Sequence, residues 1–154
     1  MKLSTKSRYG LRAIFDIAYN SGSLPAQVQD ISRRQGISPR YLEQIFQNLK
    51  RAGILRSKRG PQGGYCLAKK PEEITVAEIL VATERDINLV ECAGKRKKRE
   101  ECTFDGSCVT QELWSQAGAK LMDYFSGITV KDLCDRGQAL GIKREQDHRF
   151  MYFI

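Results

Sequence analysis

Histidine is almost missing from this chain of 154 residues: His148, near the C-terminal end, is the single example. Histidine is the side chain that most readily exchanges a proton near neutral pH. The sequence also contains no motif typical of a substrate pocket. Acid–base catalysis is therefore not expected, and we predict that the protein is not an enzyme.

Long apolar runs are missing as well. No stretch approaches the roughly 18 consecutive apolar residues that a membrane span needs. The first six residues, MKLSTK, lack the apolar core of a signal peptide. We therefore expect a cytoplasmic protein without membrane contact, in which the five cysteines are metal ligands or reactive thiols rather than disulfides.

Positive charge is in excess and is concentrated in the first half of the chain. The 26 Lys and Arg residues outnumber the 18 Asp and Glu residues, which gives a formal net charge of +8. Residues 1–70 hold 14 basic and three acidic residues, whereas residues 71–154 are net negative despite the basic run Lys95–Arg99. This distribution favours a first module that binds nucleic acid over a surface that is merely solubilising.

The first 70 residues carry the pattern of three helices followed by a β-hairpin. The helices are predicted from Ser4 or Thr5 to Ser21, from Pro25 to Gly36, and from Ser38–Pro39 to Gly53. In the third helix one apolar stripe is formed by Leu42, Ile45, Phe46 and Leu49. The strand-like pieces Ile54–Lys58 and Tyr65–Leu67 then flank a glycine-rich turn. This order is that of a winged helix-turn-helix.

The second half of the chain is predicted to connect and dimerise these modules. A capping box at Thr75–Glu78 starts a helix, and a long helix near residues 110–127 carries an apolar stripe at Leu113, Ala117, Leu121 and Tyr124. On so small a chain, that stripe is expected to pack against a second copy. We thus expect a mainly α protein with a small β-hairpin wing. Its predicted parts are a DNA-binding domain (1–70), a connecting helix and cysteine-bearing loop (71–109), a dimerisation helix with a following short helix (110–145), and a C-terminal tail (146–154).

Side chains suited to DNA recognition occupy the polar face of the third predicted helix. Those nearest its start are Ser38, Arg40, Tyr41, Glu43 and Gln44. Arg and Gln match the edges of guanine and adenine, Glu accepts from cytosine, and the start of a recognition helix reaches deepest into the major groove. Arg59, at the hairpin tip, is expected in a narrow minor groove. Phosphate contacts are expected from Lys58, Arg56, Lys2, Lys6 and Arg8. The alternative for each polar residue is an ordinary solvated face.

Three cysteines lie close together on a stretch without regular periodicity. Cys92, Cys102 and Cys108 are separated by nine and five residues, which differs from the spacing of a zinc knuckle and suits the wider reach of an iron–sulfur cluster. A fourth ligand is unassigned, and loop thiols without a cofactor are the alternative. Cys66 is expected in the core, and Cys134 is expected either in the core or as a spare thiol.

Three segments of the sequence resemble the signature segments of a bacterial superfamily of winged-helix regulators. They are KLSTKSRYGL (2–11), ISPRYLEQ (37–44) and RGPQGGY (59–65). The superfamily includes the iron–sulfur cluster regulator IscR, the nitric-oxide sensor NsrR and the cysteine-metabolism repressor CymR. The resemblance covers about residues 1–135. It implies a homodimeric transcription factor that binds double-stranded DNA, with the long helix crossing between subunits and with base reading by the residues of the third helix and Arg59.

The resemblance also implies a cofactor. In the cluster-binding members, three cysteines of this region hold a 2Fe–2S or a 4Fe–4S cluster, and they match Cys92, Cys102 and Cys108; we favour 2Fe–2S. The histidine ligand of IscR proteins falls on Gln111 here. The acidic ligand that other members take from near the N-terminus falls on Arg8. The fourth ligand therefore stays unassigned.

The C-terminal tail carries a second resemblance. Its last five residues, FMYFI, are similar to the aromatic, Ile-ending tail of CymR-type repressors. In those proteins such a tail docks in the active site of cysteine synthase, which implies the same partner for Tyr152, Phe153 and Ile154 here. The alternative is a tail that packs on its own domain.

These observations define one principal hypothesis and two alternatives. The principal hypothesis is a homodimeric, sequence-specific transcription regulator controlled by a cysteine-ligated iron–sulfur cluster, which senses iron–sulfur or redox state or nitric oxide. The first alternative is a cluster-free repressor of cysteine metabolism, controlled by cysteine synthase bound to the tail. The second is a small electron carrier or redox enzyme, which would lack a DNA affinity that falls steeply with salt.

Overall fold

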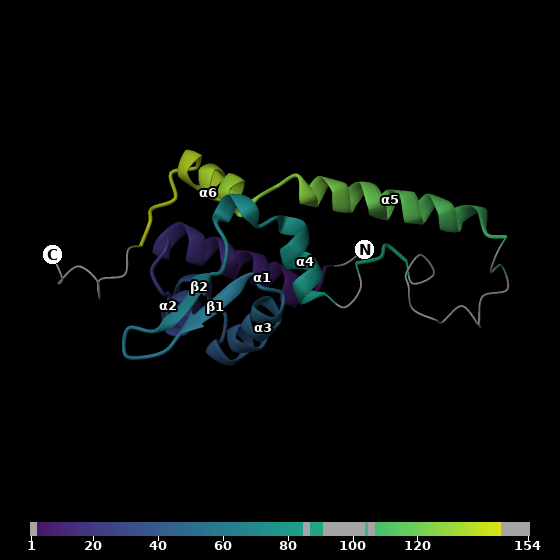
Figure 1. Ribbon diagram of the computed structural model, residues 1–154. Coiled ribbons are helices and arrows are strands. Elements are labelled where there is room, and N and C mark those ends of the chain that lie inside the picture. Colours follow the sequence, from purple (N-terminus) through teal and green to yellow (C-terminus); the bar gives the residue numbers. More distant parts are fainter. Residues whose placement is uncertain (1–2, 85–86, 91–103, 105–106, 146–154) are drawn as a thin grey trace.

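The computed structural model describes residues 3–84, 87–90, 104 and 107–145 (Figure 1). In chain order its elements are α1 (Thr5–Asp16), the π-helical η1 (Ile17–Ser21), α2 (Val28–Gln35), α3 (Pro39–Arg51), β1 (Leu55–Lys58), β2 (Gly64–Leu67), the 3-10 helix η2 (Pro71–Glu73), α4 (Val76–Thr83), α5 (Val109–Ser126) and α6 (Val130–Ala139). The two strands pair antiparallel, from Leu55 opposite Leu67 to Lys58 opposite Gly64. The predicted fold, mainly α with a small β-hairpin wing, is confirmed.

The recognition-type helix α3 begins and ends where its sequence signals predict. The Ser38 side chain accepts a hydrogen bond from the backbone N–H of Tyr41, and Pro39 occupies the first turn, where its missing N–H costs nothing. After α3, Gly53 has a φ of 71°, a left-handed conformation that glycine adopts without strain. Both ends are set by residues within the helix or next to it.

The start of α2 differs from the prediction. The helix begins at Val28, three residues later than Pro25, because the chain before it is extended and pairs with the wing. The backbone N–H of Ala26 donates to the carbonyl of Tyr65 (2.9 Å), and the N–H of Tyr65 donates to the carbonyl of Ala26 (2.8 Å). The pairing is so close that a Cβ on Gly64 would lie 2.3 Å from the Ala26 carbonyl oxygen. The wing is thereby fixed to the segment that leads into α2.

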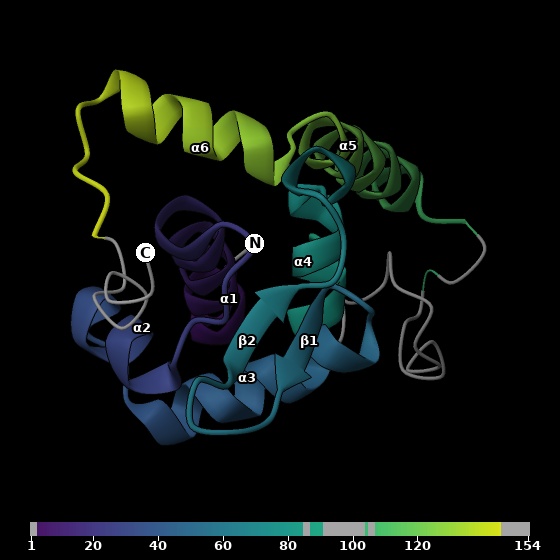
Figure 2. The ribbon, with the colours of Figure 1, turned by 60° about the vertical axis from the view of Figure 1, so that its left-hand side comes forward.

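The core lies between α1, α3 and α4, with α6 across the domain from α3 (Figure 2). The predicted stripe of α3 is confirmed: all four of its side chains are buried. Ile74, Ile79 and Val130, which follow residue 70 in the sequence, belong to the same core cluster. Helix α4 starts with the predicted capping box, and α6 starts with one formed by Thr129 and Asp132.

Helix α5 extends away from this core (Figure 1). None of its 18 residues is buried, and Leu113 is 58% and Tyr124 60% exposed. Its C-terminal part contacts α4. Most of the stability of helices in proteins comes from packing of their apolar face, and in the single chain the apolar face of α5 is largely exposed.

Among the helices of the described part of the chain, none combines the length and apolar character required to cross a bilayer.

Candidate nucleic-acid interface

The first two turns of α3 present a set of exposed polar side chains. Ser38, Arg40, Glu43 and Gln44, four of the five residues predicted to read DNA bases, are exposed there. The fifth, Tyr41, is half-buried, and its ring meets the ring of Tyr9 on α1 edge-on, with the centroids 5.9 Å apart. Tyr41 thus packs partly on α1, whereas Arg40, Glu43 and Gln44 are exposed to solvent and Ser38, also exposed, uses its hydroxyl oxygen to cap the helix.

A buried ion pair fixes α2 against α1. The side chain of Asp16, at the end of α1, is fully buried and that of Arg34 is 9% exposed. Arg34 donates through Nε to both carboxylate oxygens (3.1 and 3.0 Å) and through Nη2 to Oδ1 (2.6 Å). The Gln35 amide donates to the other oxygen, Oδ2, at 2.8 Å. Both carboxylate oxygens of Asp16 therefore accept hydrogen bonds from the end of α2, and this end leads through a short turn into α3.

The same network continues along the surface toward α3. Arg12 donates to the side-chain oxygen of Gln35 (3.1 Å) and to its backbone carbonyl (2.6 Å). The guanidinium of Arg12 also lies over the ring of Tyr9, 5.6 Å from its centroid. Since Tyr9 contacts Tyr41, a connected series of side chains runs from the buried Asp16 to the first turn of α3. This series positions the exposed face of the helix.

The wing places two predicted residues at the edge of the same module. Lys58, at the end of β1, and Arg59, at the hairpin tip, are exposed. The rings of Tyr65 on β2 and Phe46 on α3 lie 4.6 Å apart, and Lys50 Nζ donates to Ser57 Oγ (2.9 Å). The hairpin is thus packed on α3, so the basic tip and the helix keep a fixed relation.

The N-terminal turn of α1 adds further basic residues. Lys6 and Arg8 are exposed there. Lys2, the other residue predicted to contact phosphate at this end, lies outside the described residues. An exposed helix start with basic side chains is suited to phosphate groups.

Of the three predicted cluster ligands, Cys92 and Cys102 lie outside the described residues, and Cys108 is placed at the N-cap of α5. The Thr110 hydroxyl, 3.2 Å from the sulfur, and the backbone N–H of Gln111 lower the pKa of the Cys108 thiol. A lowered pKa favours the thiolate, which is the form that binds metals. Cys66 is buried, as predicted. Cys134 is also buried, which agrees with one of its two predicted placements, the core. Within the described part of the chain, no three His, Cys, Asp or Glu side chains converge to hold a metal ion.

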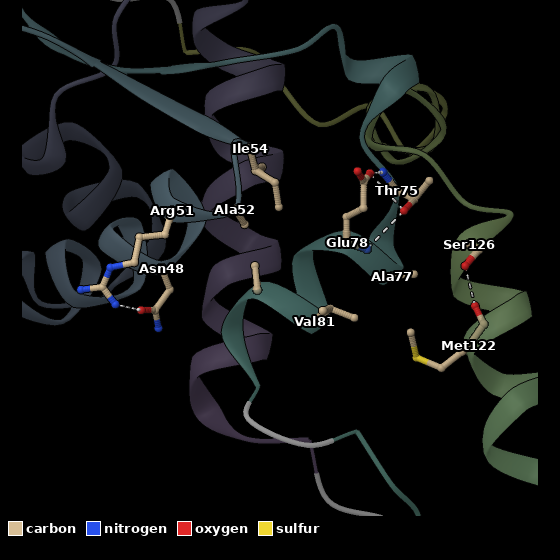
Figure 3. A pocket seen from close by; sticks show the side chains of 11 residues that line it. Asn48, Arg51, Ala52, Ile54, Thr75, Ala77, Glu78, Val81, Met122 and Ser126 are labelled. Carbon is tan, nitrogen blue, oxygen red and sulfur yellow. Dashed lines mark hydrogen bonds between the residues drawn. The ribbon is translucent and has the colours of Figure 1, made fainter. Parts of the chain in front are cut away.

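An open groove of about 660 Å³ separates the end of α3 from α4 and α5 (Figure 3). Ala52, Ala77, Val81 and Met122 are among its lining residues. The Glu78 carboxylate at its edge is occupied by the capping box, where Thr75 N–H donates to it at 2.8 Å. The C-terminal half of α5 therefore lies across this groove from the end of α3.

The geometry agrees with comparisons to known proteins. A family model described as "Rrf2: Iron-dependent Transcriptional regulator" matches residues 3–136. The chain belongs to the Rrf2 family. The Rrf2 regulator "HTH-type transcriptional regulator IscR" of Photorhabdus laumondii subsp. laumondii is 37% identical over 148 residues, which cover 96% of this chain and 88% of that protein. A "Putative HTH-type transcriptional regulator" of Haemophilus influenzae is 39% identical over 149 residues, covering 97% of this chain and 94% of its own length.

Two solved Rrf2-type structures have the same fold. IscR of T. potens has a TM-score of 0.74 and 32% identity, and the match covers 94% of each chain. CymR of B. subtilis, described as the global cysteine regulator, has a TM-score of 0.71 and 31% identity, over 88% of this chain and 98% of CymR. The predicted superfamily is confirmed, and the chain is a DNA-binding transcription regulator of the Rrf2 family rather than an enzyme.

The polar residues that hold this interface in place were not predicted from the sequence. They are Asp16, Gln35 and Arg12, together with Glu84, which binds the start of α1. One signal was available: Asp16 is an acidic residue within the apolar run from Ile14 to Ile17, a position where a buried partner is required.

Proposed function

We propose that this Rrf2 protein is a homodimeric regulator whose sequence-specific DNA binding is controlled by an iron–sulfur cluster. The observation that carries the DNA-reading part of the proposal is the exposed start of α3 beside a basic wing. Ser38, Arg40, Glu43 and Gln44 would face base edges in the major groove, with Tyr41 at the edge of the set. Arg59 would enter the adjacent minor groove, and Lys58 and Lys2 would contact phosphates.

The dimer is supported by the exposed apolar face of α5. Leu113 and Tyr124 are more than half exposed on a helix that has no buried residue. Trp114, 40% exposed, widens this face. A second copy that packs along α5 would cover the face and would set the spacing of two α3 helices, as two half-sites on DNA require.

The cluster is assigned to Cys92, Cys102 and Cys108. Thiolates are the ligands that iron–sulfur clusters use, and Cys108 fits this role because it is partly accessible and its hydrogen bonds lower the pKa of its thiol. We favour 2Fe–2S, with 4Fe–4S as the other cluster type and with the fourth ligand unassigned. When bound, the cluster supplies iron–thiolate bonds that respond to redox state or to nitric oxide. Cys108 would tie the cysteine-bearing segment to the first turn of α5, so that the state of that segment biases the spacing of the two α3 helices.

Anaerobic purification tests cluster control directly. The protein should be coloured and should contain iron and sulfide, and Cys102→Ala should lose the colour, the iron and the sulfide. Cys66→Ala, which alters a buried thiol of β2 outside the proposed ligand set, is the matched control and should retain them. Duplex binding is measured in parallel, so that the cluster and the DNA-binding surface are assessed separately.

A colourless, iron-free protein after anaerobic reconstitution would contradict cluster control. If that protein still bound DNA, the alternative of a cysteine-metabolism repressor would be favoured, with cysteine synthase bound to Tyr152, Phe153 and Ile154. These residues lie outside the described part of the chain. The segment just before them packs on the winged helix: Tyr19 donates its hydroxyl to the carbonyl of Ile142 (2.7 Å), and Arg144 lies over the Tyr19 ring.

A further inference from the structure

A carboxylate from the end of α4 holds the first turn of α1. Glu84 Oε1 accepts hydrogen bonds from the backbone N–H of Ser4 (2.7 Å) and from the hydroxyl of Ser7 (2.5 Å). Ser7 is fully buried, and its oxygen lies 3.0 Å from the hydroxyl of Thr83. Ser4 is the N-cap of α1, and its own side chain accepts from the N–H of Ser7. The start of α1 is therefore fixed by residues that lie about 80 positions later in the sequence.

The packing around this contact leaves little freedom. One turn after Ser7, Gly10 meets α4 so closely that a Cβ on it would lie 2.9 Å from the Thr83 side chain. Burial raises the pKa of the Glu84 carboxyl, but the hydrogen bonds from Ser7 and Ser4 outweigh this effect and leave the pKa below its ordinary value. Glu84 is therefore ionised at neutral pH, the form that accepts these hydrogen bonds best.

The two residues on either side of Ser7 are basic and exposed. Lys6 and Arg8 share the turn that Glu84 holds, and they belong to the set expected to bind phosphate. Glu84 lies eight residues before Cys92, so the segment proposed to carry the cluster joins the DNA-binding module at this contact.

We propose that Glu84 is a positioning residue for DNA binding, which holds the first turn of α1 so that Lys6 and Arg8 contact the phosphate backbone. The inference rests on the proposed placement of DNA against α3 and the wing. Net charge alone argues for the opposite effect, because a carboxylate beside a polyanion site weakens binding. Removal of the Glu84 charge therefore gives opposite results under the two explanations.

Phosphate contacts are independent of base sequence, so any duplex reports on them. The probe is a fluorescein-labelled duplex of about 30 base pairs with arbitrary sequence, a length comparable to the 20–30 base-pair sites of many regulators. Its affinity for the full-length protein is measured by anisotropy over a series of salt concentrations. The slope of log K against log salt is negative, and each phosphate group that the protein no longer neutralises makes it shallower by about 0.9. At 0.1 M salt this corresponds to binding that is about eightfold weaker.

Glu84→Gln should bind this duplex more weakly, by about eightfold for each phosphate group that is no longer neutralised and with a correspondingly shallower salt slope. Ser7→Ala keeps the net charge and should change binding in the same direction. The matched control is Asp132→Asn on α6, which removes a carboxylate that caps a helix in the same way, by accepting from the N–H (2.8 Å) and hydroxyl (2.7 Å) of Thr129. That control should bind as the wild type does, or slightly more tightly.

Four results would decide against the proposal. Glu84→Gln that binds as the wild type does means that Glu84 does not position the basic residues, and tighter binding means that Glu84 acts only through its charge. A variant with fewer folded molecules but the wild-type salt slope means that Glu84 stabilises the fold without positioning the basic residues. A wild-type protein without salt-dependent duplex binding would overturn the proposed interface together with the role of Glu84.

Discussion

Replacement of Arg34 with alanine should destabilise the protein far more than the same replacement at its neighbour Arg33. Both arginines lie in the last turn of α2 and both form an ion pair. Arg34 binds the fully buried Asp16, whereas Arg33 is 60% exposed and binds Glu145, which is 44% exposed. The two variants remove the same side chain from the same turn, so they isolate the effect of burial.

The magnitude follows from what Arg34→Ala leaves behind. The variant removes all three guanidinium hydrogen bonds to Asp16 and leaves one hydrogen bond, from the Gln35 amide. A buried charge without its partner costs about 3–5 kcal/mol. Since small domains are stable by only about 5–15 kcal/mol, this is a large part of the total. A midpoint of thermal unfolding lower by roughly 10 °C is expected.

Urea and thermal unfolding, followed by circular dichroism, measure these differences. Arg33→Ala should leave the urea midpoint unchanged, because exposed ion pairs contribute little. In Arg34→Ala/Asp16→Asn the uncompensated charge is also removed, so the double variant should recover part of the stability. Equal, small decreases in Arg33→Ala and Arg34→Ala would refute the argument that the buried pair holds α2 in place.

Two further predictions concern Arg59 at the hairpin tip and the proposed dimer. Arg59→Ala should weaken binding about tenfold on a site with A·T pairs beside the half-site and relax that preference, whereas an equal decrease on every duplex would mark a phosphate contact. Leu113→Asp should sediment as a monomer at micromolar concentration, because the dimer would bury an unpaired charge. The control Ala119→Asp, which lies off the apolar stripe of α5, should remain a dimer. A dimeric Leu113→Asp protein would contradict the proposed dimer helix.

The features that were predicted correctly from the sequence depend on residues near one another in the chain. The Ser38 cap, the Thr75–Glu78 capping box and the buried stripe of α3 each involve residues within one to three helical turns. Their interactions are determined by the helical period, which is readable without any tertiary structure. For this reason the helix-turn-helix and the exposed face of α3 could be predicted.

The features that were missed depend on residues far apart in the sequence. Helix α2 starts late because Ala26 pairs with Tyr65, and Tyr41 is half-buried because Tyr9 packs against it. The contacts between Asp16 and Arg34, and between Ser7 and Glu84, join residues 18 and 77 positions apart. No local pattern specifies such pairs, because each exists only once the helices have packed. Sequence alone thus predicted the exposed polar face of α3 but not the residues that hold this helix in position.

Helix α5 links these two kinds of information. Its apolar stripe is a local pattern, and packing against a second copy was predicted from it; the structure adds that no residue of the helix is buried in the single chain. The N-cap of the helix is Cys108, a proposed cluster ligand, and Met122 near its other end lines the groove beside α3. A change at the cysteine-bearing segment therefore has two proposed routes to the DNA-binding module. One runs through α5, which in the proposed dimer would set the spacing of two copies, and the other runs through Glu84, which is hydrogen-bonded to the first turn of α1. Because the first route needs a dimer and the second does not, Leu113→Asp should abolish the dependence of binding on half-site spacing and leave the effect of Glu84→Gln on the salt slope intact.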